Sequence, residues 1–172
     1  QWHPWYHAAY TYNMLTYFET DAERKDALLD KAEELVKKAE EAGADQSELL
    51  AMKAWTNQNR MQINPMERWQ TYGAQANQQL QESIASNPEN PRPYYLQGVS
   101  LFFTPEQFGG GAKVALPLLE KSIEKFEAFE NDDLLWPRWG HKAAEQFASQ
   151  ARAKIDNNVD TGGDIENESE ED

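Results

Sequence analysis

Residues 74–102 read AQANQQLQESIASNPENPRPYYLQGVSLF, and this stretch decides the fold. Apolar residues recur at intervals of three and four in both halves, which is the period of a helix. Pro88, Pro91 and Pro93 lie between the two halves. Because each proline disfavours helical backbone in the residue before it, the stretch predicts two helices joined by a tight turn.

The same period, broken by proline and glycine, continues along most of the chain and predicts an all-α fold of about seven helices. Asp21 is placed to cap the second helix, and Gly43 to end it. The expected helices span residues 4–20, 22–43, 47–61, 65–86, 91–102, 112–130 and 137–155. We therefore expect one helical domain over residues 1–155, followed by an acidic tail over 156–172.

The helices repeat one another along the chain. A shift of 44 residues places Ala32 on Ala76 and Val36 on Leu80, and a further 39 residues reach Ala115 and Leu119. Three residues after the large position of each copy comes a small residue, which is Ala39, Ser83 or Ser122. In the next helix of each pair, the shift of 44 relates Ser47 to Pro91, Leu50 to Tyr94, Met52 to Leu96 and Ala54 to Gly98. Alternation of small and large residues lets helices pack closely, so antiparallel helix pairs are expected to stack side by side.

This pattern resembles the tetratricopeptide repeat. The resemblance covers roughly residues 22–130, with PRPYYLQGVSLF similar to a first helix and AQANQQLQESIASNP to a second. Each repeat is about ten residues longer than the 34 typical of the family. The stretches NPENPRPYYLQG and FTPEQFGGGAK also resemble exported bacterial members. The resemblance implies a curved scaffold with a concave groove that recruits a peptide or protein.

By the repeat register, the first helix of each pair lines this groove. Arg92 is expected to pair with a carboxylate or chain terminus, and the aromatic residues to supply apolar contact. The groove residues expected on this basis are Glu48, Ala51, Trp55, Gln58, Arg92, Tyr95, Val99 and Phe102. In WPRWG, Trp136 and Trp139 either seal the end of the superhelix or join the interface. The function expected is a non-enzymatic scaffold in a cell-envelope complex.

Composition excludes several classes of protein. The net charge is −14, and eight of the 30 acidic residues follow the last base, Lys154. Without a basic cluster, neither nucleic acid nor an anionic membrane is an expected partner. The chain has no cysteine, which excludes disulfides and thiolate sites. No apolar run could span a membrane, and a start at Gln1 favours a periplasmic or secreted protein whose signal peptide has been removed.

No catalytic motif is present. The stretch FGGGAKVA, residues 108–115, carries glycines and a lysine as a phosphate-binding loop does. Its glycine spacing is wrong, however, and no hydroxyl residue follows Lys113. A turn between two helices is therefore the favoured interpretation, although bare amides at the next helix start could still bind an anion. The sequence predicts neither an enzyme nor a cofactor.

Two alternative functions stay open. The chain has 20 aromatic residues, which could line the pocket of a small-ligand-binding subunit of a transporter. A calcium- or copper-binding accessory protein would instead use His3 and His7, or the tail residues Asp156, Asn158 and Asp160. The spacing of glycine and of Glu168 departs from a calcium loop, so no dedicated metal site is expected.

Overall fold

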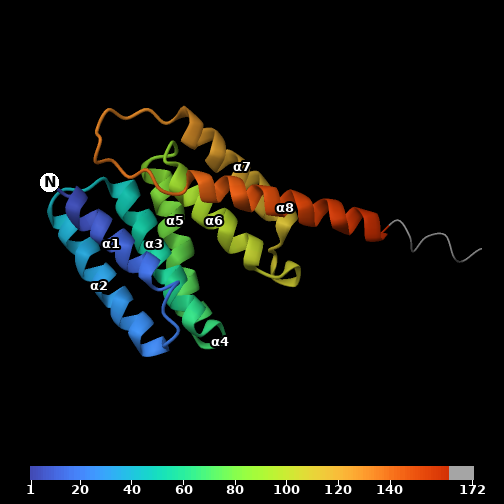
Figure 1. Ribbon diagram of the computed structural model, residues 1–172, viewed down its shortest axis with the longest axis horizontal. Helices are drawn as coiled ribbons and strands as arrows, with labels where there is room; N and C mark the ends of the chain where they lie inside the picture. The colour runs from blue at the N-terminus through green and yellow to red at the C-terminus, as the bar shows by residue number, and fades with distance from the viewer. Residues whose placement is uncertain (163–172) are drawn as a thin grey trace, which may run out of the picture.

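The computed structural model describes residues 1–162, with side chains to residue 157, and these residues form helices without any β-strand (Figure 1). The elements are α1 (His3–Leu15), α2 (Ala22–Glu41), α3 (Gln46–Ile63), α4 (Pro65–Arg68), a π-helix (Trp69–Gly73), α5 (Ala74–Ser86), α6 (Pro91–Phe103), a 3-10 turn (Glu106–Phe108), α7 (Ala112–Ala128) and α8 (His141–Gly162). α4, the π-helix and α5 follow one another without a break. The described residues thus form seven helical rods, which confirms the predicted fold class.

Local chemistry explains where the helices begin and end. The carboxylate of Asp21 accepts a hydrogen bond from the backbone N–H of Arg24 at 2.9 Å, as expected for the cap of α2. Gly43, just beyond the end of α2, has φ of 79°, a conformation that glycine adopts without steric cost. The cap of α3 is Asp45, two residues before the expected Ser47.

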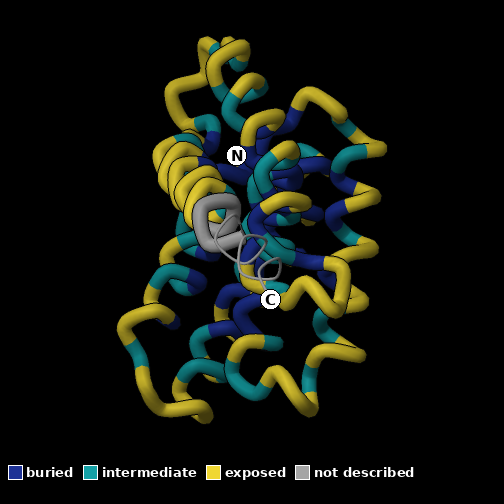
Figure 2. The backbone as a smooth tube through the Cα atoms, turned by 90° about the vertical axis from the view of Figure 1, so that its right-hand side faces the viewer, coloured by how far each residue is buried: buried dark blue, intermediate teal, exposed yellow. Residues whose placement is uncertain are grey.

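Consecutive helices pack against one another in chain order. α1 and α2 lie antiparallel at one end of the molecule, and α8 crosses α6 and α7 at the other, with its C-terminal half projecting beyond them (Figure 1). Buried residues face the interior of this stack and exposed residues the outside (Figure 2). None of the helices in the described part is both long and apolar enough to cross a membrane.

The repeat found in the sequence is present in the structure. All nine equivalent positions in α2, α5 and α7 are buried, with 2% exposure or less: Ala32, Val36, Ala39, Ala76, Leu80, Ser83, Ala115, Leu119 and Ser122. The hydroxyl of Ser83 donates to the carbonyl of Ser47 at 2.8 Å, and that of Ser122 to the carbonyl of Pro91 at 2.9 Å. These two hydrogen bonds occupy equivalent places, so consecutive helix pairs are joined in the same way.

The boundaries differ from prediction at both ends of the described chain. α1 ends at Leu15 instead of residue 20, and α8 begins at His141 instead of residue 137. The delay of α8 has a physical cause, because residues 129–140 cross the face formed by α1, α3 and α6, and Gly140 turns the chain with φ of 107°. α8 also continues past residue 155 to Gly162, while residues 163–172 of the expected acidic tail lie outside the described part.

We expect Gly98→Ala to destabilise the fold. A Cβ atom at this position would lie 2.8 Å from Cγ of Leu119, closer than carbon atoms approach. The free energy of unfolding should fall by about 1–3 kcal/mol, as in other overpacked cores. Urea unfolding would measure it, with Gln97→Ala on the same helix as the control, and equal stability of the two variants would contradict the close α6–α7 contact.

Candidate functional site

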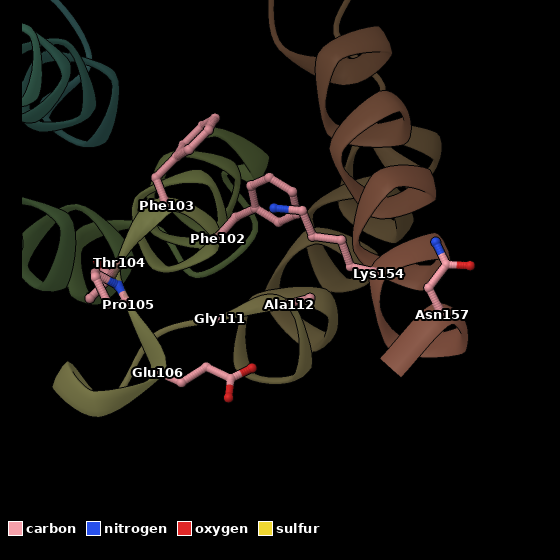
Figure 3. A pocket seen from close by; sticks show the side chains of 9 residues that line it. All are labelled: Phe102, Phe103, Thr104, Pro105, Glu106, Gly111, Ala112, Lys154 and Asn157. Atoms are coloured by element: carbon pink, nitrogen blue, oxygen red, sulfur yellow. The ribbon is translucent and has the colours of Figure 1, made fainter. Parts of the chain in front are cut away.

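A cavity of about 500 Å³ opens between the C-terminal end of α6, the loop after it and the last turns of α8 (Figure 3). Its lining residues among those described are Phe102, Phe103, Thr104, Pro105, Glu106, Gly111, Ala112, Lys154 and Asn157. Cavities of 300–1,000 Å³ commonly hold small organic ligands. This cavity is therefore the candidate ligand site.

Two consecutive phenylalanines form its aromatic wall. Neighbouring residues on a helix point about 100° apart, so Phe102 turns inward and is 5% exposed, whereas Phe103 is 65% exposed. Figure 3 shows the two rings directed to different sides of α6. The ring of Phe147 on α8 lies 5.7 Å from both. The site thus offers the exposed ring of Phe103 to a ligand, and the packed rings of Phe102 and Phe147 support it.

The glycine run shapes the floor of the cavity by turning the chain sharply. The backbone N–H of Gly111 donates to the carbonyl of Leu101 at 2.9 Å, which folds the loop back onto the end of α6. A Cβ atom on Gly110 would lie 2.1 Å from the carbonyl oxygen of Thr104, so only glycine fits there. The run is a turn between α6 and α7, as the sequence favoured.

The polar groups of the cavity can hold an anionic group but do not resemble a metal site. The ammonium of Lys154 lies 4.1 Å from the centre of the Phe102 ring, and a lysine so placed can also reach a ligand carboxylate. Glu106 supplies the one carboxylate among the described lining residues. Histidine, tyrosine, methionine and cysteine, which commonly coordinate transition metals, are absent from that same set.

A second cluster of polar side chains is buried near the other end of α6. Arg92 donates from Nη1 to Oε1 of Glu48 at 2.7 Å and from Nη2 to the carbonyl of Pro137. The phenol of Tyr6 donates to Oε2 of Glu48 at 2.7 Å and accepts a hydrogen bond from the indole of Trp139. Burial raises the pKa of the Glu48 carboxyl, which the charge of Arg92 offsets only in part. This network joins four segments of the chain.

Most of the residues predicted to line a groove are buried. Glu48 and Arg92 are 2% and 1% exposed, and Trp55, Gln58 and Phe102 are also buried, as is Ala51. Tyr95 and Val99 are partly buried. Trp136 and Trp139 lie over this face of the helices, where they pack against the core. A peptide could reach the predicted groove only if residues 129–140 moved away.

Nothing in the described part forms a metal site. His3 Nε2 lies 3.1 Å from the carboxylate of Asp133, and His7 Nε2 lies 2.8 Å from the carbonyl of Leu135. No group of three histidine, cysteine or acidic side chains lies close enough to hold a metal ion within the residues searched. The expected calcium ligands fall on the end of α8 and beyond, where side chains after residue 157 lie outside the described part.

Of the nine lining residues, the sequence predicted only Phe102 as a site residue, and three of the others supply most of the chemistry of the cavity. Phe103 and Lys154 were not singled out, and Glu106 was noted only as part of the loop between helices. The adjacent pair Phe102–Phe103 was the available signal, because a helix cannot bury both rings on one face. The position of Lys154 against α6 depends on the packing of α8, which no local pattern encodes.

No family model matches the chain, that of the tetratricopeptide repeat included, and no curated protein matches it. A solved structure, the HusA haemophore from Porphyromonas gingivalis, is similar, with a TM-score of 0.80 and 38% sequence identity. The similarity covers 90% of this chain and 76% of that one. It therefore extends well beyond a shared arrangement of helices.

This similarity overturns the function predicted from the sequence. The concave face was expected to make the chain a scaffold for peptides or proteins, but the similar protein is a haemophore, a carrier of a small ligand. The physical reason for the error is the packing of Trp136 and Trp139, from residues 129–140, over the face formed by α1, α3 and α6. The alternative of a small-ligand-binding protein agrees better with the finding.

We expect Arg92→Met to lower the free energy of unfolding by roughly 3–5 kcal/mol, because it leaves the Glu48 carboxylate buried without its positively charged partner. The double variant Glu48→Met/Arg92→Met removes both charges and should lose less than the sum of the single losses. Urea unfolding at neutral pH gives the three values and the coupling between the sites. Strictly additive losses would contradict the ion pair.

Proposed function

This chain belongs to the family of the HusA haemophore, and we propose on that basis that it is a non-enzymatic protein that binds haem. The observation that carries the proposal is the similarity to that haemophore, which extends over 90% of this chain at 38% sequence identity. We propose further that the haem lies in the cavity between α6 and α8.

The chemistry of the cavity suits such a ligand. Haem is a flat, largely apolar ring that carries two propionates on one edge. The exposed ring of Phe103 offers a surface on which this macrocycle can stack. The ammonium of Lys154, which reaches from α8 over the ring of Phe102, can pair with a propionate. A volume of about 500 Å³ with an open mouth leaves one edge of the ring in solvent.

The expected partner changes with the ligand. A carrier has to receive its cargo and hand it over, so the protein partner predicted from the sequence becomes, in this proposal, a donor or acceptor of haem in the cell envelope. The exported location predicted from the sequence fits the same role.

We predict that Phe103→Ala lowers haem affinity by at least about tenfold, since stacking of one aromatic ring on another contributes around 1 kcal/mol and its burial by the ligand contributes more. Phe103 is 65% exposed, so its removal should leave the fold intact. Quenching of tryptophan fluorescence during a haem titration measures the affinity.

Phe108→Ala is the matched control for this experiment. Phe108 lies five residues further on, in the 3-10 turn after α6, is 73% exposed and is not among the residues lining the cavity. If both variants bind haem as the unchanged protein does, the cavity is not the haem site, even where haem binding itself is observed.

We also predict that iron-free protoporphyrin IX binds within about threefold of the affinity of haem. The described lining of the cavity provides no customary iron ligand. In this proposal the affinity therefore comes from contacts with the ring and the propionates, which both ligands share. Parallel titrations of the two ligands test this. A loss of more than a hundredfold without iron would place the ring where a histidine or tyrosine can coordinate the metal.

A further inference from the structure

Residues 129–140, here termed the strap, join α7 to α8 without regular secondary structure and lie along the top edge of the molecule in Figure 1. Leu134 in the strap is 87% exposed, whereas Pro137 is buried. The backbone hydrogen bonds of the strap are local in the described chain, such as Trp136 N–H to the carbonyl of Asp133. Side chains therefore hold the strap against the helices.

The indole of Trp139 lies in a pocket of other aromatic rings. It stacks on Trp55 at 5.1 Å between centroids and 24° between planes. Tyr10 lies 5.6 Å away on α1, and Tyr95 lies 6.3 Å away on α6 in an edge-on arrangement. The indole N–H donates to Tyr6 at 3.1 Å. Rings from three helices thus surround one ring supplied by the strap.

The guanidinium of Arg92 closes this pocket and is incompletely satisfied. It lies 5.3 Å from the centre of the Trp139 ring. Its Nη1 is paired with Glu48, and its Nη2 donates to the carbonyl of Pro137. The buried Nε has no hydrogen-bond partner. The edge formed by Nε and Nη2 therefore offers two donors to a single carbonyl oxygen.

A carboxylate would satisfy this edge better than the strap does. Arginine binds carboxylates through two parallel N–H···O bonds, and one face of the guanidinium presents that geometry through Nε and Nη2. In this structure the carbonyl of Pro137 accepts from Nη2 and leaves Nε without a partner. A ligand with its ring in the place of Trp139 and a carboxylate in the place of that carbonyl would fill both positions.

We propose that the face of α1, α3 and α6 holds a second ligand site, for a flat aromatic ring with a carboxylate on a short aliphatic arm, and that the strap occupies it in this structure. Under the proposed function, the edge of a haem ring with its propionate is a ligand of this kind. Only this identification of the ligand rests on the proposed function. Trp139 and Pro137 act as a built-in substitute for the ligand.

The anchors of the strap allow it to leave without unfolding the helices. On α1 they are His3, which contacts the carboxylate of Asp133, and His7, which contacts the carbonyl of Leu135. When the strap leaves, Glu48 keeps Arg92 Nη1 as its partner. The ion pair that joins α3 to α6 therefore remains in place while the free edge of Arg92 becomes available.

The test uses indole-3-propionate, whose ring matches that of Trp139 and whose arm carries a carboxylate. We expect Trp139→Ala in the full chain to bind one equivalent by titration calorimetry. Indole-3-propionamide, which lacks the charge, should bind at least about tenfold more weakly, because charged hydrogen bonds contribute more than neutral ones. The double variant Trp139→Ala/Arg92→Lys should show a similar loss, since lysine lacks the two-donor edge.

Leu134→Ala is the matched control, because Leu134 is in the strap but exposed. It should bind the probe no better than the unchanged chain. Equal affinity of Trp139→Ala for the acid and the amide would overturn the proposal, since the variant would then contain only an apolar cavity. Absence of binding to a folded Trp139→Ala variant would overturn it as well.

A measurement on the unchanged chain covers the case in which Trp139→Ala does not fold. Saturating indole-3-propionate should speed hydrogen exchange in the strap, as it displaces Trp139, while the amide should not. Unchanged exchange at millimolar acid would contradict the proposal. Because neither experiment uses haem, their outcome is independent of the Phe103→Ala titration that tests the proposed function.

Discussion

The buried ion pair between Arg92 and Glu48 is the interaction on which the arrangement of the chain depends. It joins α3 to α6, and through Tyr6 and the carbonyl of Pro137 it also fixes α1 and the strap. Two charges removed from water are costly unless each is paired and hydrogen-bonded. In this register of the four segments, Arg92 and Tyr6 both reach Glu48, so its buried carboxylate is paired and hydrogen-bonded.

The helical part of the fold was predictable because it follows from short-range rules. Spacing of three and four residues indicated the helices, and Asp21 and Gly43 marked the ends of α2. The register of the repeat was predictable for a steric reason. Where helices approach closely, only small residues fit, so Ala76 and Ala115 had to recur at equivalent positions, and both are buried.

The candidate site was not predictable by the same rules, because it depends on contacts between distant residues. The groove expected from the repeat register presumed that the inner faces of α3 and α6 were open. Trp136 and Trp139, which follow Arg92 by more than forty residues, pack over that face instead. Conversely, the exposure of Phe103 depends on the turn after α6 and on the position of α8, neither of which periodicity encodes.

The two proposed ligand sites lie at opposite ends of α6. Arg92 and Phe103 are eleven residues apart, which corresponds to about 16 Å along the helix axis. Between them Gly98 is pressed against Leu119, so α6 cannot slide along α7 without repacking the core. A ligand against Phe103 therefore has no mechanical route to the strap through a shift of α6. Tyr95, which contacts Trp139 and also packs against the cluster that contains Phe102, is the side chain through which the open cavity and the strap can be coupled.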